Sequence, residues 1–203
     1  MFRYKCFNEA RVENVGQIPK YDYDSEPFTR TEYGSYEIPI DFRFIAHIAR
    51  LYNTFYNFKS FEFILKDASV SLRGFAKFFR GNAKDKFEQM QRFEKFLIIR
   101  NVPVRYGEID VEIDHGLHRL DNLDQTIVGP ILEKTISMEK SLLEDLYVIL
   151  KSTQDTNRRF FIDQFINEEI DQLYLLEVLR GRYAKYNSTA TIRHLLDSEL
   201  ANE

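Results

Sequence analysis

The histidines and the single cysteine of this 203-residue chain do not form a known metal-ligand or nucleophile motif. No two of the histidines (His47, His115, His118 and His194) have the spacing of an HExxH motif. Cys6 is the only cysteine, so one chain forms neither a disulfide nor a cysteine-based zinc site. Because Cys6 also has no His or Asp partner beside it in the sequence, we do not expect it to act as a nucleophile.

Carboxylates are the other residue type suited to metal chemistry, and two groups of them have a regular spacing. Asp85 and Glu88 are three residues apart, which places them on one face of a helix. Asp110, Glu112 and Asp114 alternate with apolar residues, and an exposed extended segment explains that pattern without a metal. By spacing alone, both groups are typical of solvated charges.

The composition limits the classes of protein to which the chain can belong. It is 44% hydrophobic and 30% charged, which is enough for a sizeable core. The net charge of −4 gives no electrostatic reason to expect nucleic acid as a partner. The apolar runs are far shorter than the roughly 18 residues of a membrane span, so we expect no membrane partner. Residues 1–6 lack an apolar leader, which favours a cytoplasmic protein unless a leader has been removed.

The positions of apolar residues predict a succession of helices. From Pro39 onward, apolar residues recur at steps of three and four, as on one face of a helix. We expect helices over about 25 residues from Pro39, then over about 70–99, 117–151, 158–182 and 190–199. Ser69 is a candidate N-cap of the second helix, and Gly129-Pro130 should kink the third or mark its true start. Much of the aromatic content, 18 Phe and 12 Tyr, falls on these stripes.

The order of these elements predicts an all-α fold, a four-helix bundle with a short fifth helix over residues 38–203. Residues 102–114 alternate apolar and polar, so we expect a long extended crossover between the second and third helices. One such crossover is the connectivity of ferritin-like bundles, although periodicity alone leaves several four-helix families open. Residues 1–37 show no sustained period, and we interpret them as an extended arm. The arm either packs on a neighbouring subunit or is a floppy tail.

Short motifs in the expected order make the chain resemble ferritin over about residues 30–200. Gly74-Phe-Ala-Lys-Phe-Phe79 is close to the N-F-A-K-Y-F segment of ferritins. Leu132-Glu-Lys134 and Ser141-Leu-Leu-Glu144 are similar to the third-helix L-E-K and S-L-L-E, with a two-residue insertion between them. Asn167-Glu-Glu169 is similar to the fourth-helix N-E-Q, and Ile192–Asp197 is similar to the short fifth helix.

The resemblance implies that most ligands of a ferroxidase di-iron centre have been replaced. The first-helix Glu corresponds to Arg50, or to Leu51 by an ungapped count, and neither residue holds iron. The second-helix Glu and His correspond to Lys86 and Gln89. The third-helix Glu corresponds to Glu133, or to Thr135 by counting back from Ser141. The fourth-helix ligand position corresponds to Glu169.

A lysine at the position of a ligand Glu resembles the light-type ferritin pattern. We expect Lys86 to form a buried ion pair or triad with Glu133 and Glu169 in place of two metal ions. The alternative is that Lys86 extends to solvent. The same alignment places Asp85 and Glu88 at cavity-facing positions where light-type shells nucleate mineral, with Glu168 as a further candidate and uncharged Gln91 at the third such position.

The entry channel is altered in the same comparison. The resemblance places Arg159 and Ile162 where ferritin three-fold channels have an Asp and a Glu, with Asp163 one place away. A ring of arginines would repel Fe(II), whereas Asp163 would restore some attraction.

These features favour a non-catalytic, light-type subunit of a ferritin-like shell. The resemblance implies self-assembly into a 24-subunit shell, alone or mixed with a heavy-type subunit, and iron held as an Fe³⁺ mineral. The alternative is an iron-free cage with a structural or chaperone-like protective role. A true di-iron oxidase with moved ligands is a third interpretation, and the shortage of carboxylates at the matched positions argues against it.

Overall fold

In the computed structural model, the described residues are 40–102, 125–186 and 190–202. They form α1 (Ile40–Lys66), α2 (Arg73–Ile99), the 3₁₀ turn η1 (Gln125–Ile127), α4 (Val128–Ser152), α5 (Thr156–Tyr186) and α6 (Ala190–Asn202). The described residues contain no strand, which confirms the all-α prediction. None of their helices combines the length and apolarity that crossing a membrane requires. The predicted arm and nearly all of the predicted crossover lie outside the described residues.

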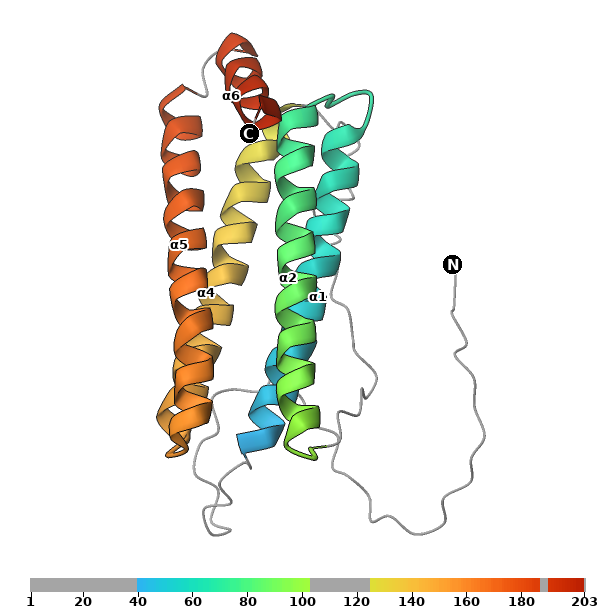
Figure 1. Cartoon of the computed structure of the whole chain (residues 1–203). Helices are drawn as coiled ribbons and strands as arrows, with labels where there is room; N and C mark the ends of the chain where they lie inside the picture. The colour runs from blue at the N-terminus through green and yellow to red at the C-terminus, as the bar shows by residue number, and fades with distance from the viewer. Residues whose placement is uncertain (1–39, 103–124, 187–189, 203) are drawn as a thin grey trace, which may run out of the picture. The chain divides into compact units, whose positions relative to one another are not determined.

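The four long helices form two closely packed pairs, α1 with α2 and α4 with α5, which meet mainly where α1 packs against α4. In Figure 1, α2 ends where α1 begins, at the lower end of the bundle, whereas α4 begins at the upper end. Thus α2 and α4 run in the same direction, as the predicted one-crossover connectivity requires. Pro130 lies in the first turn of α4, where its missing N–H leaves no helical hydrogen bond unmade, so Gly129-Pro130 marks the start of a helix.

Two hydrophobic clusters fill the bundle, one above the other. The upper cluster includes Phe58, Phe75, Phe79 and Leu132, and the lower one includes Phe44, Phe93 and Phe165. Each long helix contributes to both clusters and has a buried polar residue between its two apolar stretches. These residues are Thr54 and Asn57 on α1, Lys86 and Gln89 on α2, Glu139 on α4 and Glu169 on α5. A polar layer therefore crosses the middle of the core.

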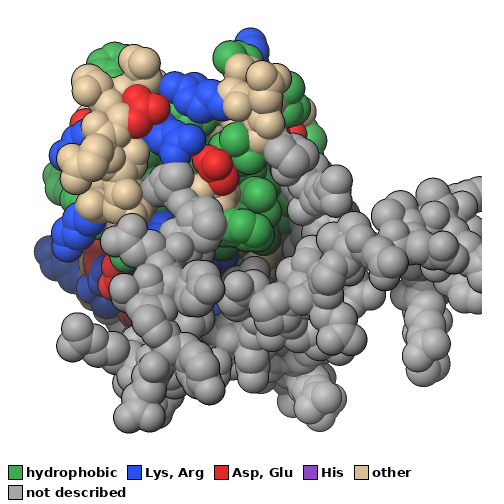
Figure 2. Space-filling model, turned by 90° about the horizontal axis from the view of Figure 1, so that it is seen from below, with side chains coloured by type: hydrophobic (Ala, Val, Ile, Leu, Met, Phe, Trp, Pro, Cys, Tyr) green, Lys and Arg blue, Asp and Glu red, His purple; other side chains and the backbone are tan. Residues whose placement is uncertain are grey.

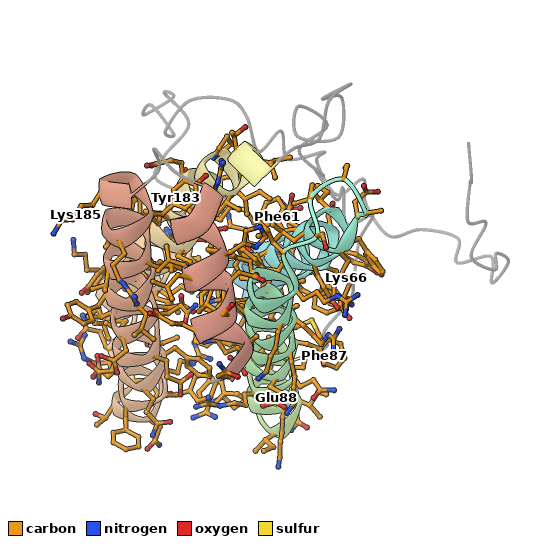
Figure 3. All side chains as sticks on the ribbon, turned by 90° about the horizontal axis from the view of Figure 1, so that it is seen from above. Phe61, Lys66, Phe87, Glu88, Tyr183 and Lys185 are labelled. Carbon is orange, nitrogen blue, oxygen red and sulfur yellow. The ribbon has the colours of Figure 1, made fainter. Side chains whose placement is uncertain are left out.

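The short helix α6 lies across the upper end of the bundle and packs mainly on α2 (Figure 3). Its Asp197 accepts a 2.9 Å hydrogen bond at Oδ1 from the backbone N–H of Phe75, in the first turn of α2. Asp197 thereby caps α2, and the prediction that Ser69 would be the cap is wrong. Ser69 instead donates its backbone N–H and hydroxyl to Asp67, which forms the turn before α2.

Side chains of several kinds remain on the outside of the bundle. At its lower end, hydrophobic, basic and acidic side chains lie among one another on the described surface (Figure 2). Ile170 on α5 is 43% exposed although it is apolar, because the neighbouring Glu169 takes the inward position in the polar layer.

Candidate functional site

A buried ion triad occupies the centre of the polar layer. The Lys86 ammonium donates hydrogen bonds of 2.6 and 2.7 Å to the two carboxylate oxygens of Glu169, across the space between α2 and α5. Lys86 Nζ also lies 2.7 Å from Oε2 of Glu139 on α4. All three side chains are almost completely buried, so the prediction that Lys86 pairs with Glu169 is confirmed and its extension to solvent is wrong.

The pKa values of the two acids of this triad are shifted in opposite directions. Burial raises the pKa of the Glu139 carboxyl well above its usual range. Burial acts in the same direction on Glu169, but the Lys86 charge and hydrogen bonds outweigh it and lower the pKa of that carboxyl. The hydrogen bonds agree with these pKa directions. Glu169 accepts both hydrogen bonds from Lys86, whereas neither Glu139 oxygen has a well-oriented hydrogen-bond partner among the described residues. We therefore interpret the triad as a Lys86–Glu169 ion pair beside Glu139, which is the acid of the two that holds a proton more readily.

The lysine itself stays charged despite its burial. Burial lowers the pKa of Lys86, but the neighbouring charges of Glu139 and Glu169 raise it above its ordinary value. A cation held at this point repels a metal ion, so Lys86 disfavours metal binding at the position that the resemblance assigns to a ligand Glu.

Glu133, predicted to join the triad, lies elsewhere, and that prediction is wrong. Its side chain is 61% exposed and accepts a 3.2 Å contact from Arg180 on α5. The alternative, Thr135, is buried and donates its hydroxyl to the Ile131 carbonyl. The third-helix acid is Glu139, six residues beyond Glu133 and therefore on a different face of α4. A signal for it was present: Glu139 continues the inward spacing of Ile136 and Leu142.

The remaining ligand positions on α1 and α2 also lack metal-binding groups. Leu51 is fully buried in the lower hydrophobic cluster. Arg50 points outward and pairs with Asp145 of α4 at 2.7 Å. Gln89 takes the place expected for a histidine, and its Nε2 is 3.4 Å from Glu168 Oε2. Among the described residues, no three or more His, Cys, Asp or Glu side chains converge to hold a metal ion.

Beside the triad, a groove of about 380 Å³ lies between α2 and α5. All of its lining side chains except Leu175 are polar: Asn82, Asp85, Lys86, Glu88, Gln89, Arg92, Glu168, Asp171, Gln172 and Leu175. The structure thus brings together Asp85, Glu88 and Glu168, the three predicted nucleation residues. Figure 3 shows Glu88 on α2.

Two of these three acids have basic partners. Both oxygens of Glu168 contact Arg92 Nη1, at 2.8 and 2.9 Å. Glu88 lies 3.5 Å from Lys84, one turn earlier on α2. Asp85 makes no ion pair with another described residue, and burial together with the negative charge of Glu88 raises its pKa. Asp85 is therefore the acid of these three that has no basic ion-pair partner among the described residues.

The start of α5 contains the residues that the resemblance places at an entry channel. Arg159 donates from Nη1 to the carbonyl oxygens of Leu150 and Thr153, both at 3.2 Å, and so caps the end of α4. Ile162 is buried in the lower cluster and Asp163 is exposed. Local structure thus accounts for Arg159 without a channel.

Comparison with known proteins bears on the identity of the fold. The ferritin-like domain model of the ferritin family matches residues 45–184, which is well over half of the chain and includes every residue of the triad and the groove. No curated protein matches the sequence. The bundle connectivity and this match agree, and the chain belongs to the ferritin family.

Proposed function

We propose that this chain is a non-catalytic, light-type subunit of a ferritin-like shell that holds iron as an Fe³⁺ mineral. The observation that carries the proposal is the Lys86–Glu169 ion pair in the middle of the bundle. A di-iron ferroxidase centre needs carboxylate and imidazole ligands around two cations. The resemblance places Lys86, Gln89 and either Arg50 or Leu51 at three of those positions, so this chain would not oxidise Fe(II) by itself.

Storage without oxidation depends on carboxylates that face the mineral. We propose Asp85 and Glu88 as the main nucleation residues, with Glu168 a weaker one because Arg92 already neutralises it. Assembly into a 24-subunit shell would make the α2–α5 groove part of the inner surface. In this proposal a heavy-type partner subunit supplies Fe(III), and the present chain supplies surface on which it deposits.

The experiment is to purify the assembly and to measure its size, its iron content and its rate of Fe(II) oxidation, alone and mixed with a heavy-type ferritin subunit. We expect a large assembly that oxidises Fe(II) slowly alone and accumulates iron in the mixture. A monomer or dimer would contradict the shell, and a mixed assembly that takes up no more iron than its heavy-type share would contradict storage.

Residue-level support comes from two variants in the mixed assembly, one that changes acids inside the groove and one that changes an acid outside it. Asp85→Asn combined with Glu88→Gln should lower the iron deposited per shell. Asp163→Asn, which removes an exposed acid of α5 outside the groove, should leave it unchanged. Equal iron deposition in the unmodified assembly and in both variant assemblies would contradict nucleation at Asp85 and Glu88.

A further inference from the structure

The α2–α5 groove contains hydrogen-bonding groups that the described protein leaves unused. Asn82 and Gln89 are 7% and 8% exposed, and Asn82 Nδ2 and Gln89 Oε1 have no hydrogen-bond partner. Gln172 Nε2, on the opposite wall, is also buried without a partner. A buried polar atom left unpaired costs about 1–3 kcal/mol, so three in one groove indicate a site made for polar contacts.

The charges of the groove exclude an anion as the occupant. Its two cations are already committed, Lys86 to Glu139 and Glu169, and Arg92 to Glu168. Two of its acids, Asp85 on α2 and Asp171 on α5, make no ion pair with another described residue. On both walls of the groove, the charges without a described ion-pair partner are therefore negative.

The shape of the lining favours a long organic cation over a metal ion. The lining runs from Asn82 to Arg92 on α2, about 15 Å at 1.5 Å per residue, and about 10 Å along α5. The acids are spread along this length, and no three of them converge in the manner of a metal site. Gln89 Oε1 can accept from an ammonium group as it stands, whereas Asn82 and Gln172, whose unpaired atoms are N–H donors, present an oxygen there once the amide group turns by 180°.

We propose that this groove binds a linear aliphatic polyamine whose ammonium groups pair with Asp85 on one wall and Asp171 on the other. The amides of Asn82, Gln89 and Gln172 accept the remaining N–H groups along the chain, and Leu175 contacts its methylenes. Such a ligand bridges α2 and α5 beside the polar contacts that already join them. Lower in the bundle, the same two helices meet through aromatic packing of Phe93 with Phe165. The inference does not depend on iron storage.

The test is calorimetric titration of the iron-free, full-length assembly with spermidine, compared with butylamine and 1,4-butanediol. We expect one saturable spermidine site per chain, at least about tenfold weaker binding of butylamine, and no binding of the diol. Bound spermidine should raise the unfolding temperature, because it binds only the folded chain. No saturable binding, binding of the diol, or displacement of spermidine by an equal concentration of Mg²⁺ would overturn the proposal.

Matched variants localise the site. Asp171→Asn should weaken spermidine binding about tenfold, whereas Asp163→Asn, which removes the same charge two turns earlier on α5, should change it less than about twofold. Asn82→Leu should remove binding while leaving the fold intact, because it replaces an unpaired buried amide with an apolar group of similar size. Equal weakening by Asp163→Asn and Asp171→Asn would show diffuse attraction to an acidic protein. Unchanged binding by Asn82→Leu would place the amine outside the groove.

Discussion

Lys86 on α2 donates both of its shortest hydrogen bonds, 2.6 and 2.7 Å, to Glu169 on α5, which is 83 residues away in the sequence. This ion pair connects the two helix pairs of the bundle between its upper and lower hydrophobic clusters. In the proposed function, the same two side chains stabilise the bundle and take the place of metal ligands.

Removing the lysine should destabilise the bundle strongly. In Lys86→Met, Glu169 remains buried without its cation, and we expect a loss of about 3 kcal/mol in the free energy of unfolding. Lys84→Met, two residues earlier with a side chain 75% exposed, should change it by less than about 0.5 kcal/mol. Urea unfolding of both variants measures the difference, and equal stabilities would contradict a buried, charged Lys86.

The two acids of the triad should respond differently to the same substitution. Because burial favours the neutral form of Glu139, Glu139→Gln, which puts a neutral side chain of the same size there, should lower the free energy of unfolding by about 1 kcal/mol or less. Glu169→Gln removes the charge that balances Lys86 and should lower the free energy of unfolding by about 3 kcal/mol. Urea unfolding at neutral pH ranks the variants, and the reverse order would show that the proton resides on Glu169.

Glu62 should make the stability of the bundle depend on acid pH. Its side chain is 2% exposed and accepts contacts from Lys59, Lys66 and, at 2.7 Å, Arg80 of α2. Burial raises its pKa, but hydrogen bonds from these three cations lower it from 4.5 to about 2. Since the folded-state pKa is the lower one, the stabilisation is complete above about pH 4.5 and is lost as the pH falls toward 2.

We expect Glu62→Gln to lower the free energy of unfolding by about 1–3 kcal/mol at pH 7. This loss is smaller than the full pKa shift implies, because the three cations are partly exposed and water screens their charges. The difference in unfolding free energy between the wild type and Glu62→Gln should shrink steadily between pH 5 and 2. The exposed Glu133→Gln serves as the control, with a change below about 0.5 kcal/mol at pH 7. A Glu62→Gln difference that stays constant over this pH range would contradict the argument.

Gly74 should be required for α6 to dock on α2. A Cβ at this position would lie 1.7 Å from the carbonyl oxygen of Asp197, which is backbone and has little room to move. Gly74→Ala should therefore displace α6 and break the Asp197 cap on Phe75, at a cost of about 2 kcal/mol or more. Limited proteolysis should then cleave the chain near its C-terminal helix.

Gly81, on the same helix, is the matched control, because a Cβ there meets nothing within 4 Å. Gly81→Ala should stabilise α2 by about 0.5–1 kcal/mol through helix propensity. If Gly74→Ala resists proteolysis as well as Gly81→Ala does, α6 does not depend on this close contact.

Helix type and order were predictable from the sequence because four apolar stripes have the spacing of helices and Gly129-Pro130 marks the start of one of them. The Lys86–Glu169 pair was predictable because both residues fall at motif-matched positions. Glu139 was not predicted because the L-E-K match assigned the third-helix acid to Glu133. The two-residue insertion after that match makes it an unreliable guide to which face of α4 each acid occupies. The Asp197 cap could not be predicted, since it joins residues 122 apart in the sequence and depends on how α6 docks.

The most direct test of the central claim, that this ferritin-family chain lacks an oxidase site, is the rate of Fe(II) oxidation by the purified chain alone under air. Absorbance of Fe(III) species against time, compared with a protein-free buffer, gives that rate. The Lys86–Glu169 pair predicts a rate close to that of the buffer, with no saturable dependence on Fe(II). A fast, saturable oxidation proportional to protein concentration would contradict the account.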